Sequence, residues 1–261
     1  MTANRRLQND NDPAQNRFTP LEILCEDGPV IAINKPAGLL TQGGPPGNPE
    51  TAIALVKSYL KEKYQKPGNV YLGVPHRLDR PVTGVLALAR NSKAAARLAE
   101  QFRERQVRKI YWAVVEGIPH PEVGELVDWL VKLPDQAHVE VADEEDDDAK
   151  ECRLRYRTLA TIPIGSHGKP QSIVEVELLT GRSHQIRVQL SSRGYPIVGD
   201  VQYGAESKLP GPNSTMGFRE HPIALHARML TILHPVRYEP LTITAPAPKL
   251  WRKWTSRLPS D

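Results

Sequence analysis

Cysteine is scarce in this chain of 261 residues, and its scarcity excludes several classes of protein. Cys25 and Cys152 are the only two; they stand far apart, and neither belongs to a Cys-x-x-Cys pair. The sequence therefore offers no disulfide framework and no cysteine-based zinc or redox site. Long apolar runs are also missing: none approaches the roughly 20 residues of a membrane helix. Because the first residues lack the apolar core of a secretory signal, we expect a cytoplasmic protein with reduced thiols and no membrane partner.

The composition is that of a folded globular protein. Hydrophobic residues make up 39% of the chain and charged residues 25%, which is enough material for a core. The length suits one large domain or two small ones. Residues 1–18 are polar and lack apolar periodicity, so they predict a flexible N-terminal tail. We expect the folded part to cover 19–252 and a C-terminal tail to follow over 253–261.

The charges are unevenly distributed along the chain. The formal net charge is +4 and the pI about 9.0. Six consecutive acids occupy 143–148, and basic clusters occupy 103–109, 153–157 and 182–193. A basic surface suits a polyanion, but scattered solvated lysines and arginines explain the same numbers equally well. The acidic run lacks the glycine turn and spaced ligands of a calcium loop, so it predicts a solvated hairpin tip or loop.

Periodic apolar segments predict a mixture of strands and helices. The predicted strands are 30–33, 85–89, 110–115 and 172–178, with late strands, or a strand after a short helix, over 224–233 and 241–245. The predicted helices are 51–64, a helix from Ser92 as N-cap to 105, and 183–193 ended by Gly194. Because strands and helices do not alternate regularly, the pattern favours an α+β fold over a doubly wound sheet.

Residues 76–85, which read HRLDRPVTGV, place the carboxylate of Asp79 between Arg77 and Arg80. An opposite charge nearby can lower the pKa of a carboxyl by about 1–3 units, so we expect Asp79 to be ionised and to act as a nucleophile or anchor rather than as a general acid. The simpler interpretation is a surface ion pair, which contributes about 0–1 kcal/mol.

This decapeptide resembles the catalytic motif of the RluA-type pseudouridine synthases, in which His-Arg-Leu-Asp precedes Thr-Ser-Gly and a hydrophobic strand. Here Val82-Thr83 stands in place of Thr-Ser, so the second hydroxyl is retained and the first is lost. Three further segments agree with the family in order and spacing: 34–39 (NKPAGL), 109–113 (KIYWA) and 180–188 (TGRSHQIRV). The resemblance runs from about residue 21 to about residue 246.

The resemblance implies a fold, an activity and a partner. The implied fold is α+β: a mixed, mostly antiparallel central sheet with a cleft, flanked by helices and loops. The implied activity of the 19–252 domain is isomerisation of specific uridines in ribosomal or transfer RNA, without cofactor or metal. Many relatives carry a small S4-type RNA-binding domain at the N-terminus, and 1–18 is too short for one. We therefore expect a monomer that binds RNA, as a stem-loop, through the catalytic domain itself.

The resemblance also assigns roles to residues. It implies that Asp79 is the catalytic carboxylate, that Tyr111 packs on the flipped uracil and brings a hydroxyl near it, and that Arg187 pairs with Asp79. Arg77 either fills the place of the flipped nucleotide or only contacts phosphate. The RNA-binding candidates are Arg77, Arg80, Lys109, Arg182 and His184.

Two other motif residues are expected to be structural, and two other functions remain open. We expect His76 to be packed and hydrogen-bonded, and Lys35-Pro36 to anchor a loop under the site. A non-catalytic RNA-binding or ribosome-assembly protein could use the same basic cleft with Asp79 inert. A glycoside hydrolase ranks last, because it usually needs two carboxylates about 5–9 Å apart and the four matched segments hold no second acid.

Overall fold

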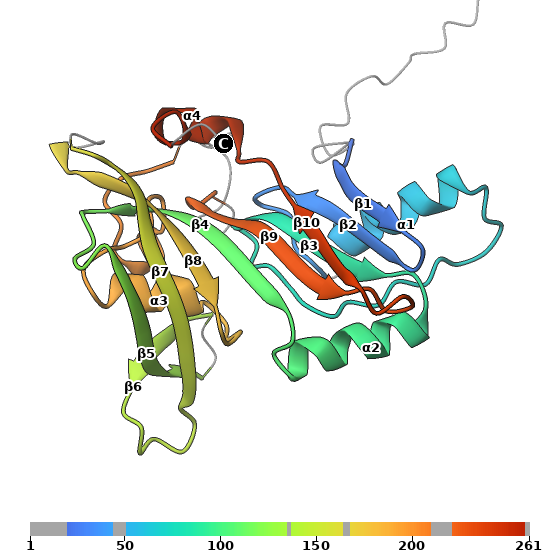
Figure 1. Cartoon of the computed structure of the whole chain (residues 1–261), viewed down its shortest axis with the longest axis horizontal. Coiled ribbons are helices and arrows are strands. Elements are labelled where there is room, and N and C mark those ends of the chain that lie inside the picture. The colour runs from blue at the N-terminus through green and yellow to red at the C-terminus, as the bar shows by residue number, and fades with distance from the viewer. Residues whose placement is uncertain (1–19, 44–50, 135–136, 164–167, 210–220, 259–261) are drawn as a thin grey trace, which may run out of the picture.

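A computed structural model describes residues 20–43, 51–134, 137–163, 168–209 and 221–258, so the tail expected over 1–18 lies outside the described part. Within these ranges the elements follow one another as shown in Figure 1. Their bounds are β1 Ile23–Asp27, β2 Val30–Lys35, α1 Ala52–Lys63, β3 Thr83–Ala89, α2 Ser92–Arg103, β4 Arg108–Glu116, β5 Val123–Lys132, β6 Val139–Ala142, β7 Lys150–Ile162, β8 Gln171–Leu178, α3 Gln185–Ser191, η2 Val201–Tyr203, β9 Leu225–Leu233, β10 Pro240–Thr244, η4 Lys249–Trp251 and α4 Arg252–Thr255.

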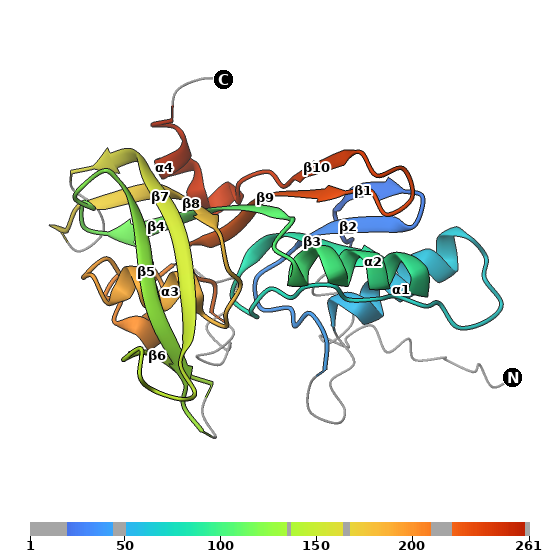
Figure 2. The same ribbon diagram turned by 60° about the horizontal axis from the view of Figure 1, so that its bottom comes forward.

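The described strands form a single sheet in the order β1-β2-β3-β9-β4-β8-β7-β5-β6, with β10 also paired to β9. All pairs are antiparallel except β3 and β9, which run parallel for two residue pairs. The sheet has two halves, one formed by β1–β3 with α1 and α2, the other by β5–β8 with α3, and β4 and β9 join them (Figures 1 and 2). The mixed, mostly antiparallel sheet predicted from the sequence is confirmed.

Strand β2, in the first half, is covered by side chains on both faces. Ile31 and Ile33 of β2 join the core cluster that contains the buried side of α1. Their neighbours Val30 and Ala32 point the other way, into a second cluster that contains Leu98 of α2. Because successive side chains of a strand alternate between faces, helices on both faces explain why this strand is a continuous apolar run.

Gly84 allows the two halves to meet. It lies where β3 runs beside β9, paired with Ala227, and its φ is +109°. A Cβ at this position would clash with the carbonyl oxygen of Ala227 and lie 2.7 Å from its nitrogen. The glycine of the 76–85 motif is therefore required by a close backbone approach, directly after the segment that carries Asp79.

We expect Gly84→Ala to lower the free energy of unfolding by about 2–4 kcal/mol, since it adds backbone strain to a steric clash. Gly194→Ala is the matched control, because Gly194 also has positive φ, +81°, but no atom lies within 4 Å of the place that a Cβ would take. Its cost should be about 1–2 kcal/mol from strain alone. Urea denaturation measures both, and equal losses in the two variants would contradict the role of the β3–β9 contact.

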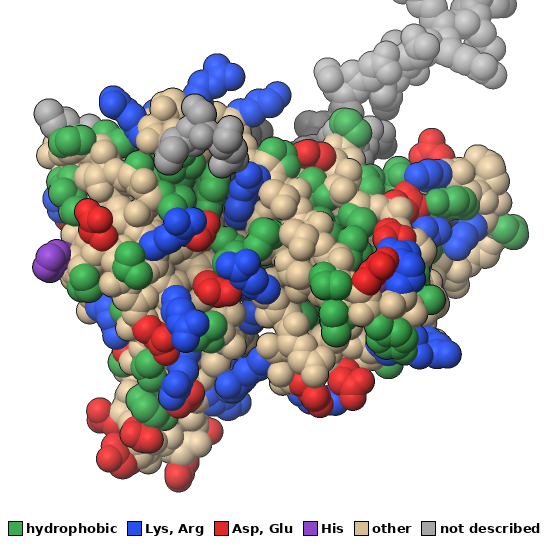
Figure 3. Space-filling view, in the orientation of Figure 1, with side chains coloured by type: hydrophobic (Ala, Val, Ile, Leu, Met, Phe, Trp, Pro, Cys, Tyr) green, Lys and Arg blue, Asp and Glu red, His purple; other side chains and the backbone are tan. Residues whose placement is uncertain are grey.

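The strands of the second half include β5, β6 and β7, which were not predicted from the sequence; nor was β1. The basic cluster over 153–157 is the exposed side of β7, whose other side buries Cys152 and Leu154. Its three arginines pair with glutamates on the same or adjacent strands: Arg153 with Glu151 at 2.9 Å, Arg155 with Glu125 at 2.9 Å and Arg157 with Glu175 at 2.8 Å. Blue and red side chains accordingly interleave over this half in Figure 3, so this cluster is largely neutralised rather than a free basic patch.

The acidic run over 143–148 is the exposed loop between β6 and β7, as predicted. Acidic side chains gather at the lower tip of this half in Figure 3. Because β6 and β7 both pair with β5 rather than with each other, the run is a connecting loop and not a hairpin tip. No helix in the described ranges has the length and apolar character needed to cross a membrane.

The predicted helix boundaries needed correction in two places. The N-cap of α2 is Asn91, whose side chain accepts the N–H of Ala94 at 2.8 Å, so the assignment of Ser92 was wrong. The helix predicted over 183–193 is shorter, because α3 covers Gln185–Ser191 and His184 before it has a left-handed backbone. The helix over 51–64 agrees with α1.

The end of the described chain is packed against the sheet. Residues 253–258 were assigned to a C-terminal tail, but α4 crosses the proposed boundary at residue 252. Trp254 is 2% exposed, and its indole N–H donates to Oε1 of Gln171 at 3.0 Å. This part of the expected tail is therefore docked on β8, because a buried indole needs an acceptor and finds one there.

Candidate active site

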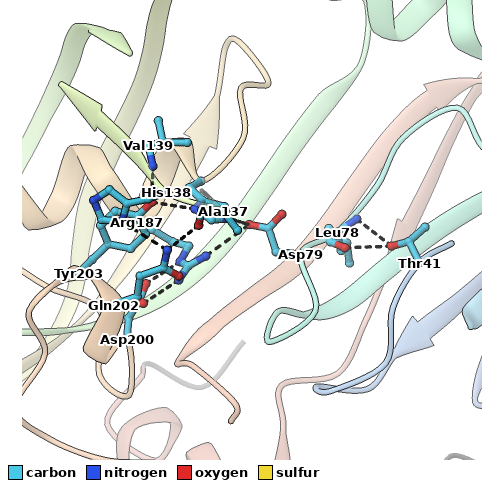
Figure 4. A network of polar contacts seen from close by, with 11 residues as sticks. Thr41, Leu78, Asp79, Ala137, His138, Val139, Arg187, Asp200, Gln202 and Tyr203 are labelled. Carbon is cyan, nitrogen blue, oxygen red and sulfur yellow. Dashed lines mark hydrogen bonds and ion pairs between the residues drawn. The ribbon is translucent and has the colours of Figure 1, made fainter. Parts of the chain in front are cut away.

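The backbone that carries Asp79 is held from both sides. The hydroxyl of Thr41 donates to the carbonyl of Leu78 at 2.9 Å and accepts the N–H of Leu78 at 3.2 Å, as Figure 4 shows. The N–H of Val82 donates to the carbonyl of Asp79 at 3.1 Å and closes the turn into β3. These contacts fix the peptide units on either side of Asp79, whose side chain remains 30% exposed.

Lys35 lies beneath this segment, and its side chain is fully buried. Its ammonium donates to the carbonyls of Pro36, Leu39 and Arg80 at 2.9, 2.8 and 3.2 Å, which confirms the predicted loop anchor. Burial lowers the pKa of Lys35 to about 7, while the charge of Asp79 acts in the opposite direction.

Arg80 braces the same loop. Its Nε donates to the carbonyl of Gly38 at 2.8 Å, and the N–H of Gly38 donates back to the carbonyl of Arg80 at 2.8 Å. Arg80 was predicted to bind RNA, but the side chain is half-buried and hydrogen-bonded within the protein. Its observed contacts are those of a residue that shapes the site.

Arg187, on α3, is the buried cation of the site. It forms a bidentate pair with Asp200, at 2.6 Å from Nε and 2.7 Å from Nη2, and Nη2 also donates to Gln202 at 3.0 Å. The remaining nitrogen, Nη1, lies 3.8 Å from Oδ2 of Asp79 (Figure 4). Burial opposes its charge, but the hydrogen bonds and charge of Asp200 outweigh burial, so the pKa of Arg187 is raised.

His184 approaches the same carboxylate oxygen from the residue before α3. Its Nε2 lies 3.8 Å from Oδ2 of Asp79, and its Nδ1 lies 2.7 Å from the hydroxyl of Tyr203. The pKa of His184 is lowered, first by burial and then by the charge of Arg187, against the pull of Asp79. The lowered pKa favours the uncharged imidazole beside the carboxylate.

Asp79 stands where two cavities meet. The larger has a volume of about 740 Å³ and the smaller about 80 Å³. They share the residues Arg77, Leu78, Asp79, His184 and Arg187. The rest of the smaller cavity is lined by the polar Arg182 and Gln185 and by five apolar or aromatic side chains, Val82, Tyr111, Leu178, Ile186 and Leu225.

Tyr111, on β4, lies in the wall of the smaller cavity. Burial raises the pKa of its hydroxyl well above the usual range, and the negative charge of Asp79 raises it further. The phenol is therefore protonated and can donate a hydrogen bond. The adjacent Trp112 stacks under the guanidinium of Arg228, at 4.6 Å from the ring centre, on the other face of the strand.

Of the other predicted residues, two line the cavities and two are packed within the protein. Arg77 is exposed and lines both cavities, and Arg182 is exposed and lines the smaller one. Lys109 lines neither; its ammonium donates to the carbonyl of Thr180 at 2.9 Å, and burial lowers its pKa to about 8. His76 is packed as predicted, stacked on Phe102 at 4.7 Å, with Nε2 accepting the N–H of Ala87 at 3.0 Å.

Four residues of this site were not predicted from the sequence, namely Thr41, Asp200, Gln202 and Tyr203. Asp200 is 1% exposed and is the closest partner of Arg187. One feature of the sequence could have indicated Asp200. It follows the apolar pair 197–198 and a glycine, and an acid so close to an apolar pair can be buried with it. In the described ranges no group of three or more His, Cys, Asp or Glu side chains is arranged to hold a metal ion.

A partly exposed carboxylate that faces a buried arginine, at the junction of a larger and a smaller cavity in a mostly antiparallel sheet, has the features of an active site. Comparison with known proteins makes this specific, because residues 29–192 match the family model for RNA pseudouridylate synthase. The chain therefore belongs to the RNA pseudouridylate synthase family. The predicted enzyme class, an RNA uridine isomerase, is confirmed.

Relatives support the same assignment over most of the chain. A ribosomal large subunit pseudouridine synthase D of Xylella fastidiosa is 38% identical over 238 residues, 88% of this chain and 67% of that protein. A tRNA pseudouridine synthase C of Haemophilus influenzae is 32% identical over 238 residues, 89% of this chain and 95% of that protein. The solved structure of human RNA pseudouridylate synthase domain containing 4 is 28% identical, has a TM-score of 0.70, and is matched over 92% of its length by 91% of this chain.

Proposed function

We propose that this protein converts specific uridines of ribosomal or transfer RNA to pseudouridine, with Asp79 as the catalytic carboxylate. Family membership supports the reaction and the class of substrate. The observation that carries the role of Asp79 is its partly exposed carboxylate at the junction of the two cavities, 3.8 Å from the buried guanidinium of Arg187. The relatives named as synthases do not favour the non-catalytic alternative.

The reaction breaks the bond between C1′ of the ribose and N1 of uracil, turns the base, and joins C1′ to C5; C5 then loses a proton, and N1 gains one. No electron is gained or lost overall. A carboxylate serves either of two routes: it can attack C1′, or it can stabilise the positive charge that develops there. Arg187 and His184 lie near one oxygen of Asp79, so both can orient the carboxylate toward the sugar.

The smaller cavity is the proposed place for the uracil. A base must leave its stack before a side chain can reach the sugar, at a cost of a few kcal/mol. The apolar walls and the ring of Tyr111 would stack on the flipped base, while the protonated phenol supplies one hydrogen bond near it. A small cavity beside a large one would also permit the base to enter while the RNA backbone stays in the larger cavity.

The larger cavity and its exposed cations are the proposed RNA-binding surface. Arg77 lies at the border of both cavities, where a planar guanidinium could replace the flipped nucleotide or bind its phosphate. Arg182 lines the smaller cavity and His184 lines both, which supports the proposal that they contact the same strand. Lys109 and Arg80, which hydrogen-bond within the protein, would act on RNA chiefly by shaping this surface.

The proposed substrate is a stem-loop, recognised by a single copy of the chain in the cytoplasm. Sequence-specific RNA recognition usually depends on splayed loops and shape rather than on duplex base edges. One similar protein is named for the large ribosomal subunit and another for tRNA. Both classes of RNA are therefore candidates, and the stem-loop is the feature that they share.

Mapping pseudouridines in ribosomal and transfer RNA, from cells with and without the gene, tests the proposal. We expect at least one uridine to lose its modification in the deleted strain and to regain it when the gene is returned. A transcript of the stem-loop around that uridine should then be modified by the purified protein at a rate similar to that for the intact RNA. Unchanged maps would exclude the function, and activity restricted to intact subunits would exclude recognition of an isolated stem-loop.

A further inference from the structure

Two neighbouring residues of η2 hold the two groups that face Asp79. Arg187 Nη1 and His184 Nε2 each lie 3.8 Å from the same oxygen, Oδ2 of Asp79. The positions of both groups are restrained by hydrogen bonds, of Gln202 to the arginine and of Tyr203 to the histidine. Gln202 and Tyr203 are adjacent in the chain and are drawn together in Figure 4.

The first connection passes through the hydroxyl of Tyr203. This oxygen accepts the N–H of Val139 at 3.1 Å and lies 2.7 Å from Nδ1 of His184. Because this oxygen already accepts from Val139, the arrangement that uses every donor and acceptor of the pair is the one in which the hydroxyl donates its own proton to Nδ1. A neutral imidazole that accepts at Nδ1 carries its proton at Nε2, on the side of Asp79. In this arrangement Tyr203 favours the tautomer that presents a donor to the carboxylate.

The second connection passes through the amide of Gln202. Its oxygen accepts from Nη2 of Arg187 at 3.0 Å, and its nitrogen donates to the carbonyl of Ala137 at 2.6 Å. The ring of Tyr203 adds a flat support for the guanidinium, 4.7 Å from the ring centre. With Asp200 on its other edge, Arg187 is held on three sides and only Nη1 is left to face Asp79.

Both connections end on the same short segment, 137–139, where the chain enters the edge strand β6. On this segment His138 stacks on the ring of Tyr203 at 4.9 Å, and Ala137 lines the larger cavity. The same three residues therefore set the position of both donors. A displacement of the segment 137–139 would therefore change the geometry around Asp79 without any direct contact between the segment and Asp79.

We infer that Gln202 and Tyr203 are positioning residues, which fix the donors opposite the carboxylate of Asp79 by tying Arg187 and His184 to the segment 137–139. The inference rests on the proposed function. Neither side chain needs to touch the uridine. Their effect is therefore on the rate of the chemical step at saturating RNA and not on the affinity for RNA, because orientation of a reacting group raises the rate constant without adding a contact to the substrate.

The test compares Tyr203→Phe with Tyr195→Phe. Tyr195 is the matched control: its hydroxyl also accepts a backbone N–H, from His120 at 3.3 Å, but it lines neither cavity. Phenylalanine at 203 keeps the ring against Arg187 and removes only the hydroxyl. The probe is a transcript that carries the uridine identified by mapping, and the measurements are the single-turnover rate constant at saturating RNA and the dissociation constant.

We expect Tyr203→Phe to lower the rate constant about 10-fold, the equivalent of one hydrogen bond. The dissociation constant should stay within about two-fold of wild type, and Tyr195→Phe should change neither value by more than about two-fold. Gln202 is half-buried and also lines the larger cavity, so Gln202→Met should lower the same rate constant by a larger factor than it changes the affinity.

Three results would overturn the inference. The first is a Tyr203→Phe rate constant equal to that of Tyr195→Phe. The second is a loss of RNA affinity with an unchanged rate constant in both the 203 and 202 variants, which would make these residues RNA contacts. The third is a wild-type protein that forms no pseudouridine in any RNA, which removes the proposed function first and the inference with it.

Discussion

Asp79→Asn is expected to abolish pseudouridine formation, with a loss of at least about 10⁴-fold in the single-turnover rate constant, as for the removal of an acting nucleophile in other enzymes. An asparagine keeps the shape of the side chain, so Thr41 and Val82 can still hold the backbone around it. The neutral amide can neither attack C1′ nor stabilise positive charge there. The measurement is product formation on the mapped transcript at saturating RNA.

RNA affinity provides the control for this variant. Removing one negative charge from the cavity should leave the dissociation constant unchanged or slightly lower, because the charge of Asp79 repels phosphate. A variant that binds RNA and makes no product separates catalysis from binding. Product formation at the wild-type rate would instead remove Asp79 from the chemistry and restore the RNA-binding alternative.

Asp200→Asn is expected to lower the free energy of unfolding by about 3–5 kcal/mol, because it leaves a buried arginine without its counter-charge. The side chains of Arg187 and Asp200 are 5% and 1% exposed, so water cannot replace the lost partner. In the variant that remains folded, the rate constant should also fall by about 10-fold or more, since Arg187 is no longer oriented toward Asp79. Urea denaturation and single-turnover assays measure the two effects.

Glu125→Gln is the matched control for a broken ion pair. Glu125 pairs with Arg155 at 2.9 Å, but the arginine side chain is 60% exposed and screened by water. Its loss should cost about 0–1 kcal/mol and leave the rate constant unchanged. Similar losses of stability at 125 and 200 would show that burial of the Arg187–Asp200 pair does not set its strength.

The predictable part of the fold was the part with simple hydrophobic patterns. The apolar run of β3 and the alternation of β8 gave correct strands, and the N-terminal region of α2 was placed within one residue. The strand β7 was missed although it alternates regularly, because arginine fills its exposed positions. In isolation that pattern resembles a basic patch, and only the ion pairs with glutamates of β7 and its neighbouring strands show that the charge of this sheet face is largely neutralised.

The candidate site also has a part that could be predicted from the sequence and a part that could not. The motif residues Asp79, Tyr111 and Arg187 are brought together as expected from the resemblance, and Lys35 anchors its loop. Asp200 was not expected, because the resemblance gave Arg187 a single acidic partner. In the structure the guanidinium makes its short contacts with Asp200 and only a 3.8 Å approach to Asp79.

By itself the sequence determined the chemical groups and the local order in which they occur: a carboxylate between arginines, a glycine at the start of a strand, and apolar runs that must be buried. The tertiary structure alone decided which cation meets which acid and which hydroxyl lies against Nδ1 of His184. The physical reason is range. Propensity and periodicity act over a few residues, whereas the partner of a buried charge is chosen by the loss of water when distant segments pack, and that loss is defined only once the sheet has closed around them.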